Sequence, residues 1–185
     1  MSSNEPSDAV RVVNALLTQL DGLKRFPNAL VLTTSNIASA VDPAFVDRAD
    51  IKQYVGPPGT QARYAILSAC IVELQRSGVM KVAETPLPWN ALLPLIPKPP
   101  VAFDVLQQLC DGGVSSAPRH SLMLHALAAS CDGISGRALR KLPFLAHALF
   151  LPSAPCSEEP VEIFLQALKH AIKHEQDSRS KMNVV

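Results

Sequence analysis

This 185-residue chain lacks a long apolar run, a cysteine cluster and an excess of either charge. No uncharged apolar stretch approaches the ~20 residues that a membrane-spanning helix needs. The N-terminal residues show neither the basic nor the apolar region of a secretory signal. We therefore expect no membrane partner and no secretion.

The net positive charge and the share of aromatic residues are both too small for a surface that binds nucleic acid. Lys and Arg number 17 against 16 Asp and Glu, and aromatic residues make up only 5%. Phosphate binding needs a basic surface, and single strands need stacking platforms. A helical nucleic-acid binder is therefore disfavoured, and we expect no direct nucleic-acid partner.

The metal-ligating residues are few and scattered. The four cysteines are Cys70, Cys110, Cys131 and Cys156, and none forms a CxxC pair. This spacing matches no zinc pattern and is typical of a reducing compartment. His170 and His174 lie one helical turn apart without a third ligand near them, so no metal site is predicted.

Apolar residues make up 48% of the chain, which predicts a packed core. Proline is frequent, with 16 residues in all and a concentration between Pro86 and Pro100. Proline removes a backbone donor and blocks a regular helix. The segment 86–100 is therefore predicted to be a loop or an insertion that divides the chain.

The first part of the chain has the pattern of an α/β fold. Apolar residues at three- and four-residue steps predict an amphipathic helix over 7–23, capped by Ser7. The apolar run 29–33 is typical of a buried parallel strand, and the β-rich segment 51–55 predicts a second one. Asp42 is placed to cap a short helix over 44–48.

The rest of the chain has a helical pattern. Helices are predicted from Thr60 to about Gly78, over 103–109 and 121–131, from Ser135 to about 149 with a kink at Pro143, and from about 160 to 176. The polar tail after Gln176 is predicted to fray.

The segment 56–60, Gly-Pro-Pro-Gly-Thr, is similar to the start of a phosphate-binding loop. That loop requires G-x-x-x-x-G-K-[ST] at the opening of a helix. Gln61, Ala62 and Arg63 stand where its second glycine, lysine and hydroxyl residue would be. We interpret 56–60 as a turn between a strand and a helix, and no nucleotide-hydrolysis motif is complete in the sequence.

Four strings nevertheless resemble one family. They are VVNALLTQLD at 12–21, LTTSN at 32–36, DPAFVDRADIKQY at 42–54 and ISGRALRKLPFLAHAL at 134–149. Together they resemble the C-terminal half of a AAA+ ATPase, and more narrowly the pachytene checkpoint ATPase family, the thyroid receptor-interacting protein thirteen homologues. The resemblance is close over 5–78 and 131–172 and weak over 79–130.

The resemblance implies an α/β part followed by an all-α part. Residues 1–58 would be the C-terminal part of the large AAA+ subdomain, with two strands of its parallel sheet. Residues 59–178 would be the helical lid, with a proline-rich insertion at about 81–118, and 179–185 a tail. Walker A and Walker B would precede residue 1, so we expect a fragment, a truncated gene model or a short isoform that does not hydrolyse ATP alone.

The resemblance also implies a biological role. Members of the family are homo-hexameric motors that use ATP and Mg²⁺ to remodel HORMA-domain proteins with the help of an adaptor. They act in meiotic recombination, chromosome-axis control and the spindle checkpoint, which places them in the nucleus, on chromosomes and in the cytoplasm. This chain alone is expected to bind no cofactor. The alternative is a noncatalytic short isoform that acts as an interaction or dominant-negative subunit.

Three residues match functional positions of the family. Asn36 matches sensor 1, whose amide orients the attacking water or the γ-phosphate. Arg48 matches an arginine that projects into the neighbouring subunit's site as a candidate trans arginine finger. Arg137 matches sensor 2, the lid arginine that touches ATP.

The residues alone also permit plainer readings of these positions. Asn36 could be a turn residue, and Arg48 could pair locally with Asp47 or Asp50. Arg137 could belong to a solvated basic face, although its place in the first turn of a helix suits phosphate oxygens.

Overall fold

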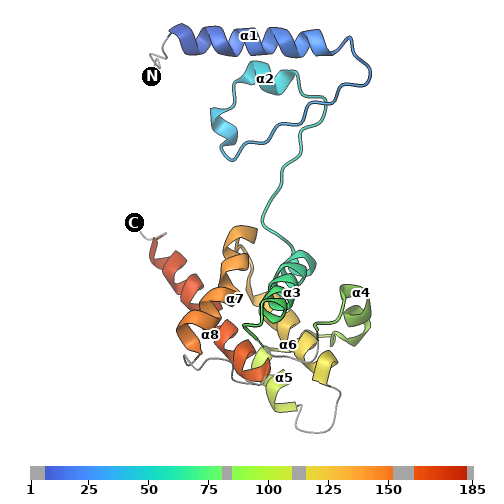
Figure 1. The fold of residues 1–185 in the computed structure, drawn as a ribbon, viewed down its shortest axis with the longest axis vertical. Coiled ribbons are helices and arrows are strands. Elements are labelled where there is room, and N and C mark those ends of the chain that lie inside the picture. Colours follow the sequence, from blue (N-terminus) through green and yellow to red (C-terminus); the bar gives the residue numbers. More distant parts are fainter. Residues whose placement is uncertain (1–6, 81–84, 110–115, 152–160, 183–185) are drawn as a thin grey trace. The chain divides into compact units, whose positions relative to one another are not determined.

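The computed structural model describes residues 7–80, 85–109, 116–151 and 161–182. The chain divides into two compact units, residues 1–55 and residues 56–185. Figure 1 shows the helices of both units.

The first unit consists of two helices and irregular chain. Helix α1 spans Ser7–Leu23, the 3₁₀ turn η1 spans Ala38–Ala40 and helix α2 spans Pro43–Asp47. The predicted cap at Asp42 is confirmed, because its Oδ1 accepts the N–H of Ala44 at 2.8 Å. Leu17 is the one buried hydrophobic side chain that the structure describes in this unit. A unit with so little core gains little from the hydrophobic effect.

The two predicted strands, 29–33 and 51–55, are not formed, and that part of the expected α/β architecture is wrong for the described residues. Both segments are irregular and exposed, with Leu30 82% and Ile51 86% accessible. A strand is stable only when neighbouring strands accept and donate its backbone hydrogen bonds. Neither segment finds such a neighbour within the described part of the chain.

The second unit is helical (Figure 1). Its elements are α3 Thr60–Arg76, α4 Trp89–Leu92, η2 Leu93–Leu95, α5 Phe103–Leu109, α6 Ser116–Ser130, α7 Gly136–Phe150 and α8 Val161–Met182. Helices α7 and α8 run antiparallel, because Gln176 and Arg179 late in α8 bond to Ser130 and Gly133 just before α7. Among the described helices, none is both long and apolar enough to cross a membrane.

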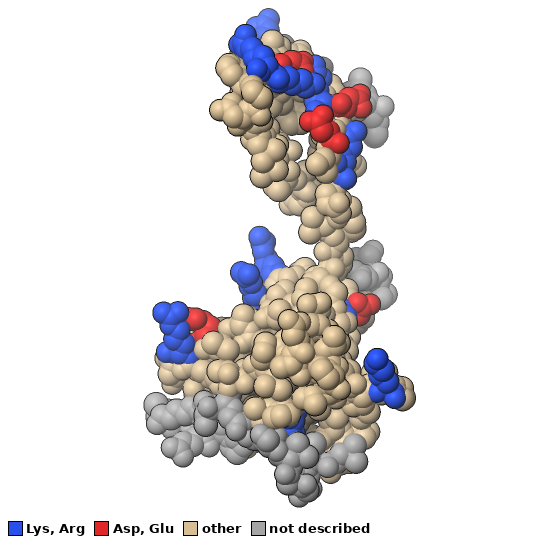
Figure 2. Space-filling view, turned by 90° about the vertical axis from the view of Figure 1, so that its right-hand side faces the viewer, with Lys and Arg blue, Asp and Glu red and all other residues tan. Residues whose placement is uncertain are grey.

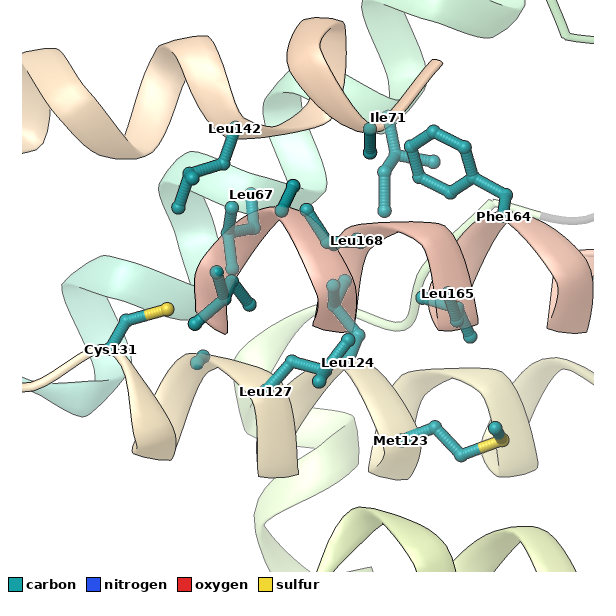
Figure 3. Packing of buried hydrophobic residues seen from close by; sticks show 14 of the residues in the cluster. Leu67, Ile71, Met123, Leu124, Leu127, Cys131, Leu142, Phe164, Leu165 and Leu168 are labelled. Atoms are coloured by element: carbon teal, nitrogen blue, oxygen red, sulfur yellow. The ribbon is translucent and has the colours of Figure 1, made fainter. Parts of the chain in front are cut away.

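One hydrophobic core joins α3, α6, α7 and α8. Figure 3 shows labelled core side chains from each of the four helices. Its fully buried large members are Tyr64, Leu67, Leu92, Met123, Leu124, Leu127, Ile134, Leu139, Leu142, Phe164, Leu165 and Leu168. Within α3, α6, α7 and α8 they recur at three- and four-residue steps, so each of these helices presents an apolar stripe to the others. The packing gives this unit a core of its own.

The proline-rich segment is short helical turns packed on the core and not simply a loop. Trp89 in α4 lies with its ring centroid 5.8 Å from that of Tyr64 and 5.8 Å from that of His125. The Tyr64 hydroxyl donates to the carbonyl of Leu87 at 2.7 Å. Ser121 Oγ accepts the N–H of Leu87 at 2.9 Å. The segment is therefore fixed by rings and hydrogen bonds from α3 and α6.

Several helix ends differ from the predictions. Helix α3 is capped by Gly59, and Thr60 is its first residue. Helix α7 continues through Pro143, with Ser135 as the predicted cap. Helix α8 does not fray after Gln176 but continues to Met182. In the added part of α8, the side chain of Arg179 donates to the carbonyl of Gly133 at 3.3 Å.

Candidate functional site

Arg137 lies in the first turn of α7 and is free to meet a ligand. The Ser135 side chain accepts the N–H of Ala138 at 3.3 Å and so begins the helix. The sequence of α7 contains basic residues and no acidic residue. Arg137 is exposed, and the described residues provide no ion pair or hydrogen bond to its guanidinium. The positive end of the helix and an unpaired guanidinium therefore coincide, an arrangement that suits an anion.

The turn before α7 is anchored in the core by buried side chains on both sides of a left-handed glycine. Cys131 and Ile134 are buried in the core, at 0% and 1% exposure. Gly133 between them has φ of +73°, a left-handed conformation that a residue with a Cβ adopts only with strain. The N–H of Ile134 donates to the carbonyl of Cys131 at 3.2 Å and closes the turn.

A buried arginine of α3 holds the same turn. Arg63 is 5% exposed, and its Nη1 lies 2.5 Å from Oδ1 of Asp132. Its Nη2 donates to Thr60 Oγ1 at 2.9 Å. The hydrogen bond and the charge of Arg63 lower the pKa of Asp132 below its ordinary value. The pair thus joins the beginning of α3 to the turn that precedes Arg137.

Arg48 forms a bidentate ion pair with Asp21, and it forms none with Asp47 or Asp50. Its Nε lies 3.1 Å from each carboxylate oxygen of Asp21, and its Nη2 lies 2.9 Å from Oδ2. Its Nη1 donates to the carbonyl of Ala44 at 2.8 Å. The hydrogen bond from Arg48 lowers the pKa of Asp21, and the carboxylate in turn raises the pKa of Arg48. The guanidinium is fully engaged within residues 1–55.

Asn36 lies in an exposed bend between 29–33 and η1. The hydroxyl of the preceding Ser35 accepts the N–H of Ile37 at 3.2 Å and donates to its carbonyl at 3.1 Å. Among the described residues, the side chain of Asn36 makes no hydrogen bond, to Arg48 or to any other residue. Asn36 and Arg48 belong to the first unit and Arg137 to the second.

Sequence reasoning missed the partners of these residues. Asp21 is 27 residues from Arg48, and Asp132 is 69 residues from Arg63. Another missed cluster is Glu162, whose Oε1 lies 2.7 Å from His120 Nε2 and 3.8 Å from Arg119 Nη1. It joins the beginnings of α6 and α8. No pattern in the sequence indicates which of many charged residues become neighbours at such separations.

No metal centre is formed by the described residues, because no three His, Cys, Asp or Glu side chains converge. His170 lies instead against the ring of Phe150, with centroids 5.9 Å apart. On the face that Figure 2 shows, basic residues are separated by uncharged surface on the second unit, and no continuous basic surface is seen there.

Two protein families match consecutive parts of this chain. Residues 1–57 match the family described as "ATPase family associated with various cellular activities (AAA)". Residues 59–176 match the family described as "TRIP13-like, AAA+ ATPase lid C-terminal domain". The helical second unit is therefore a AAA+ lid.

The relatives define the family more narrowly. The "Pachytene checkpoint protein 2 homolog" of Oryza sativa subsp. indica is 47% identical over 178 residues, which cover 95% of this chain and 36% of the relative. The human protein of the same name is 42% identical over 181 residues, covering 98% of this chain and 38% of the relative. The solved structure of C. elegans PCH-2 covers 91% of this chain and 39% of that chain, with 32% identity and a TM-score of 0.61.

The chain belongs to the TRIP13-like AAA+ ATPase family, as the resemblance of its motifs predicted. It spans less than two fifths of the length of these relatives.

Proposed function

We propose that this chain supplies the lid and part of the large subdomain to the ATP site of a AAA+ ATPase. Residues 1–58 would belong to the large subdomain and residues 59–178 to the lid. The lid would contain an insertion at about 81–118, and 179–185 would be a tail. The observation that carries the proposal is the guanidinium of Arg137 in the first turn of α7, a helix without acidic residues, where no side chain of the described residues pairs with it. Such a group provides five donors that match phosphate oxygens.

The chemistry of this donor set fits ATP. Arg137 would hold the β- or γ-phosphate, and the positive end of α7 adds to its attraction for anions. Phosphoryl transfer depends on positioning and on stabilisation of charge on the phosphate oxygens. The nucleotide supplies the transferred phosphoryl group when bound, and we assign no Mg²⁺ ligand to this chain.

Asn36 and Arg48 would complete the chain's contribution. The amide of Asn36, which has no hydrogen-bond partner among the described residues, would orient the attacking water or the γ-phosphate as sensor 1. Arg48 would act on the site of the adjacent subunit, where an arginine finger is worth about 10³–10⁵ in rate. The Asp21 contact holds Arg48 on its own subunit, so this role requires the guanidinium to leave Asp21 for the phosphate. Asp21 is exposed and Arg48 is about one third exposed, so water can replace part of their contact and the exchange costs little.

Family membership supports the wider role. The proposal is a homo-hexamer that uses ATP to remodel HORMA-domain proteins together with their adaptor, in meiotic recombination, chromosome-axis control and the spindle checkpoint. Its place of action would be the nucleus, the chromosomes and the cytoplasm. In that assembly the 185 residues contribute to catalysis only as part of a site that includes Walker A and Walker B motifs, which their sequence does not contain.

A noncatalytic role is the second candidate, and one observation favours it. The first unit exposes the large apolar side chains of Leu30, Leu32, Ile51, Tyr54 and Val55, each at 82–86%. Exposed apolar segments of β-rich composition are templates for pairing with another chain. A chain of this kind would join intact subunits and lower their activity.

An ATPase assay tests the first candidate. The chain alone should show no Mg²⁺-dependent turnover above a heat-inactivated control. A hybrid in which these 185 residues replace the matching segment of the rice relative should hydrolyse ATP. In the hybrid, Arg137→Ala should raise KM for ATP about tenfold or more, as expected for the loss of a charge-assisted hydrogen bond.

The outcomes separate the two candidates. A matched control is Arg140→Ala, which removes the same charge from an exposed position one turn further along α7. Unchanged KM with Arg137→Ala would contradict the nucleotide role. An inactive hybrid that forms mixed assemblies and lowers the activity of the intact rice protein would support the noncatalytic candidate.

A further inference from the structure

The turn between α6 and α7 is held by polar side chains from two other helices. Gln176 Nε2 of α8 donates to the carbonyl of Ser130 at 2.7 Å. Arg179 Nη1, one turn later, donates to the carbonyl of Gly133 at 3.3 Å. Arg63 of α3, which precedes the turn in the sequence, binds the carboxylate of Asp132.

The three contacts bind consecutive parts of one short segment. Ser130 is the last residue of α6, so its carbonyl has no partner within that helix and needs an outside donor. Gly133 is the left-handed residue of the turn. Two residues later Ser135 caps α7, and Arg137 follows in the first turn. A shift of 130–135 therefore moves the beginning of α7 and its arginine together.

The donors of α8 are themselves ordered. Arg179 Nε donates to Glu175 Oε1 at 2.8 Å, a contact between residues one turn apart. The Arg179 side chain is about one third exposed, and no other described carboxylate pairs with it. The family match ends at residue 176, so the contact made by Arg179 lies beyond it. Composition alone predicts that this polar end of α8 frays, but Arg179 contacts the turn through the carbonyl of Gly133.

We propose that Gln176 and Arg179 at the end of α8, together with the Arg63–Asp132 pair, are positioning residues that fix the 130–135 turn and thereby aim Arg137 at the nucleotide. This inference rests on the proposed role of Arg137. Sub-ångström placement of a binding group strongly affects how well it holds a ligand. The end of α8 is then coupled to ATP binding although it does not touch the nucleotide.

Hydrogen exchange on the 185-residue chain is the first test. Gln176→Ala/Arg179→Ala should accelerate exchange of the amides of 133–138 severalfold and leave those of Leu67 and Ile71 in α3 unchanged. Lys181→Ala is the matched control, because it removes an exposed positive charge from the same helix end and because, among the described residues, Lys181 makes no hydrogen bond or ion pair to the turn. Unchanged exchange at 133–138 in the double variant would overturn the proposal.

The second test is a double-mutant cycle in the hybrid with the rice relative. Gln176→Ala/Arg179→Ala should raise KM for ATP about two- to tenfold, the effect of a lost hydrogen bond, with kcat nearly unchanged. Adding these changes to Arg137→Ala should raise KM no further, because residues that act through one group are not additive. Asp132→Asn, which removes the charge that pairs with the buried Arg63 and keeps the shape of the side chain, should also raise KM without adding to the effect of Arg137→Ala.

The results distinguish the inference from the proposed function. If Arg137→Ala leaves KM unchanged, the nucleotide role fails and the inference fails with it. If Arg137→Ala raises KM while the α8 variant has no effect, or an effect that adds fully to that of Arg137→Ala, the inference alone is overturned. Partial recovery of KM with Arg179→Lys, which keeps a donor within reach of Gly133, would support positioning through this carbonyl.

Discussion

Leu168→Ala tests whether the lid is the part of the chain that folds cooperatively. Leu168 is completely buried, and Figure 3 shows it among core side chains of α3, α6 and α7. Truncation removes the transfer free energy of the side chain and leaves a cavity in a closely packed core. The expected loss in the free energy of unfolding is about 3 kcal/mol, within the range measured for buried leucines.

Leu30→Ala is the matched control, since it deletes the same atoms from a side chain that is 82% exposed. Its effect should be within about 0.5 kcal/mol, as for surface substitutions in general. Urea unfolding followed by far-ultraviolet circular dichroism measures both, and the m value should be unchanged. A loss below about 1 kcal/mol for Leu168→Ala, or equal losses for the two variants, would refute the assignment of the core.

Two further predictions concern the first unit and the lid. Amides of 29–33 and 51–55 should exchange at nearly unprotected rates in the isolated chain, because no strand pairs with them; slow exchange there would contradict the described structure. Burial raises the pKa of Glu162, but the hydrogen bond from His120 and the nearby positive charges outweigh it, so the pKa lies below the ordinary 4.5. Because the pKa of Glu162 is lower in the folded chain than in the unfolded chain, its ionised form stabilises the fold fully above the unfolded-state pKa, and this stabilisation is lost as pH falls through the lower folded-state pKa. Glu162→Gln should therefore destabilise the chain at neutral pH and cost progressively less as acid is added, as thermal unfolding against pH would show. A loss that does not depend on pH would contradict the ion-pair explanation.

Local features of the fold were predictable from the sequence. The helices Ser7–Leu23 and Phe103–Leu109 have the predicted bounds, and the caps at Asp42 and Ser135 are confirmed. Each depends on residues within one or two turns of each other. Apolar periodicity and a capping oxygen act over that range whatever the rest of the chain does.

Features that need distant partners were not predictable. The segment 29–33 has the composition of a buried strand, yet composition cannot provide a neighbouring strand, and the segment stays exposed. The end of α8 is polar, but Gln176 and Arg179 reach carbonyls 46 residues earlier in the chain. For the candidate site, the resemblance identified Arg48, whereas its engagement by Asp21 became visible only in three dimensions.

We propose that this chain contributes residues to an ATP site shared between subunits. Mixing of two hybrids tests it most directly, each carrying these 185 residues within the rice relative. One hybrid carries Arg48→Ala, and the other lacks the Walker B acid of the rice part. Each alone should be nearly inactive, because a lost arginine finger costs about 10³–10⁵ in rate.

If Arg48 acts on the neighbouring subunit, some mixed assemblies place an intact arginine beside an intact Walker B site. Mixing should then restore measurable ATP hydrolysis, while Arg48→Ala alone keeps its nucleotide affinity and assembly mass. An absence of recovery with subunit exchange confirmed would contradict the shared site. Near-normal activity of Arg48→Ala alone would show instead that the contact with Asp21 is the whole function of this arginine.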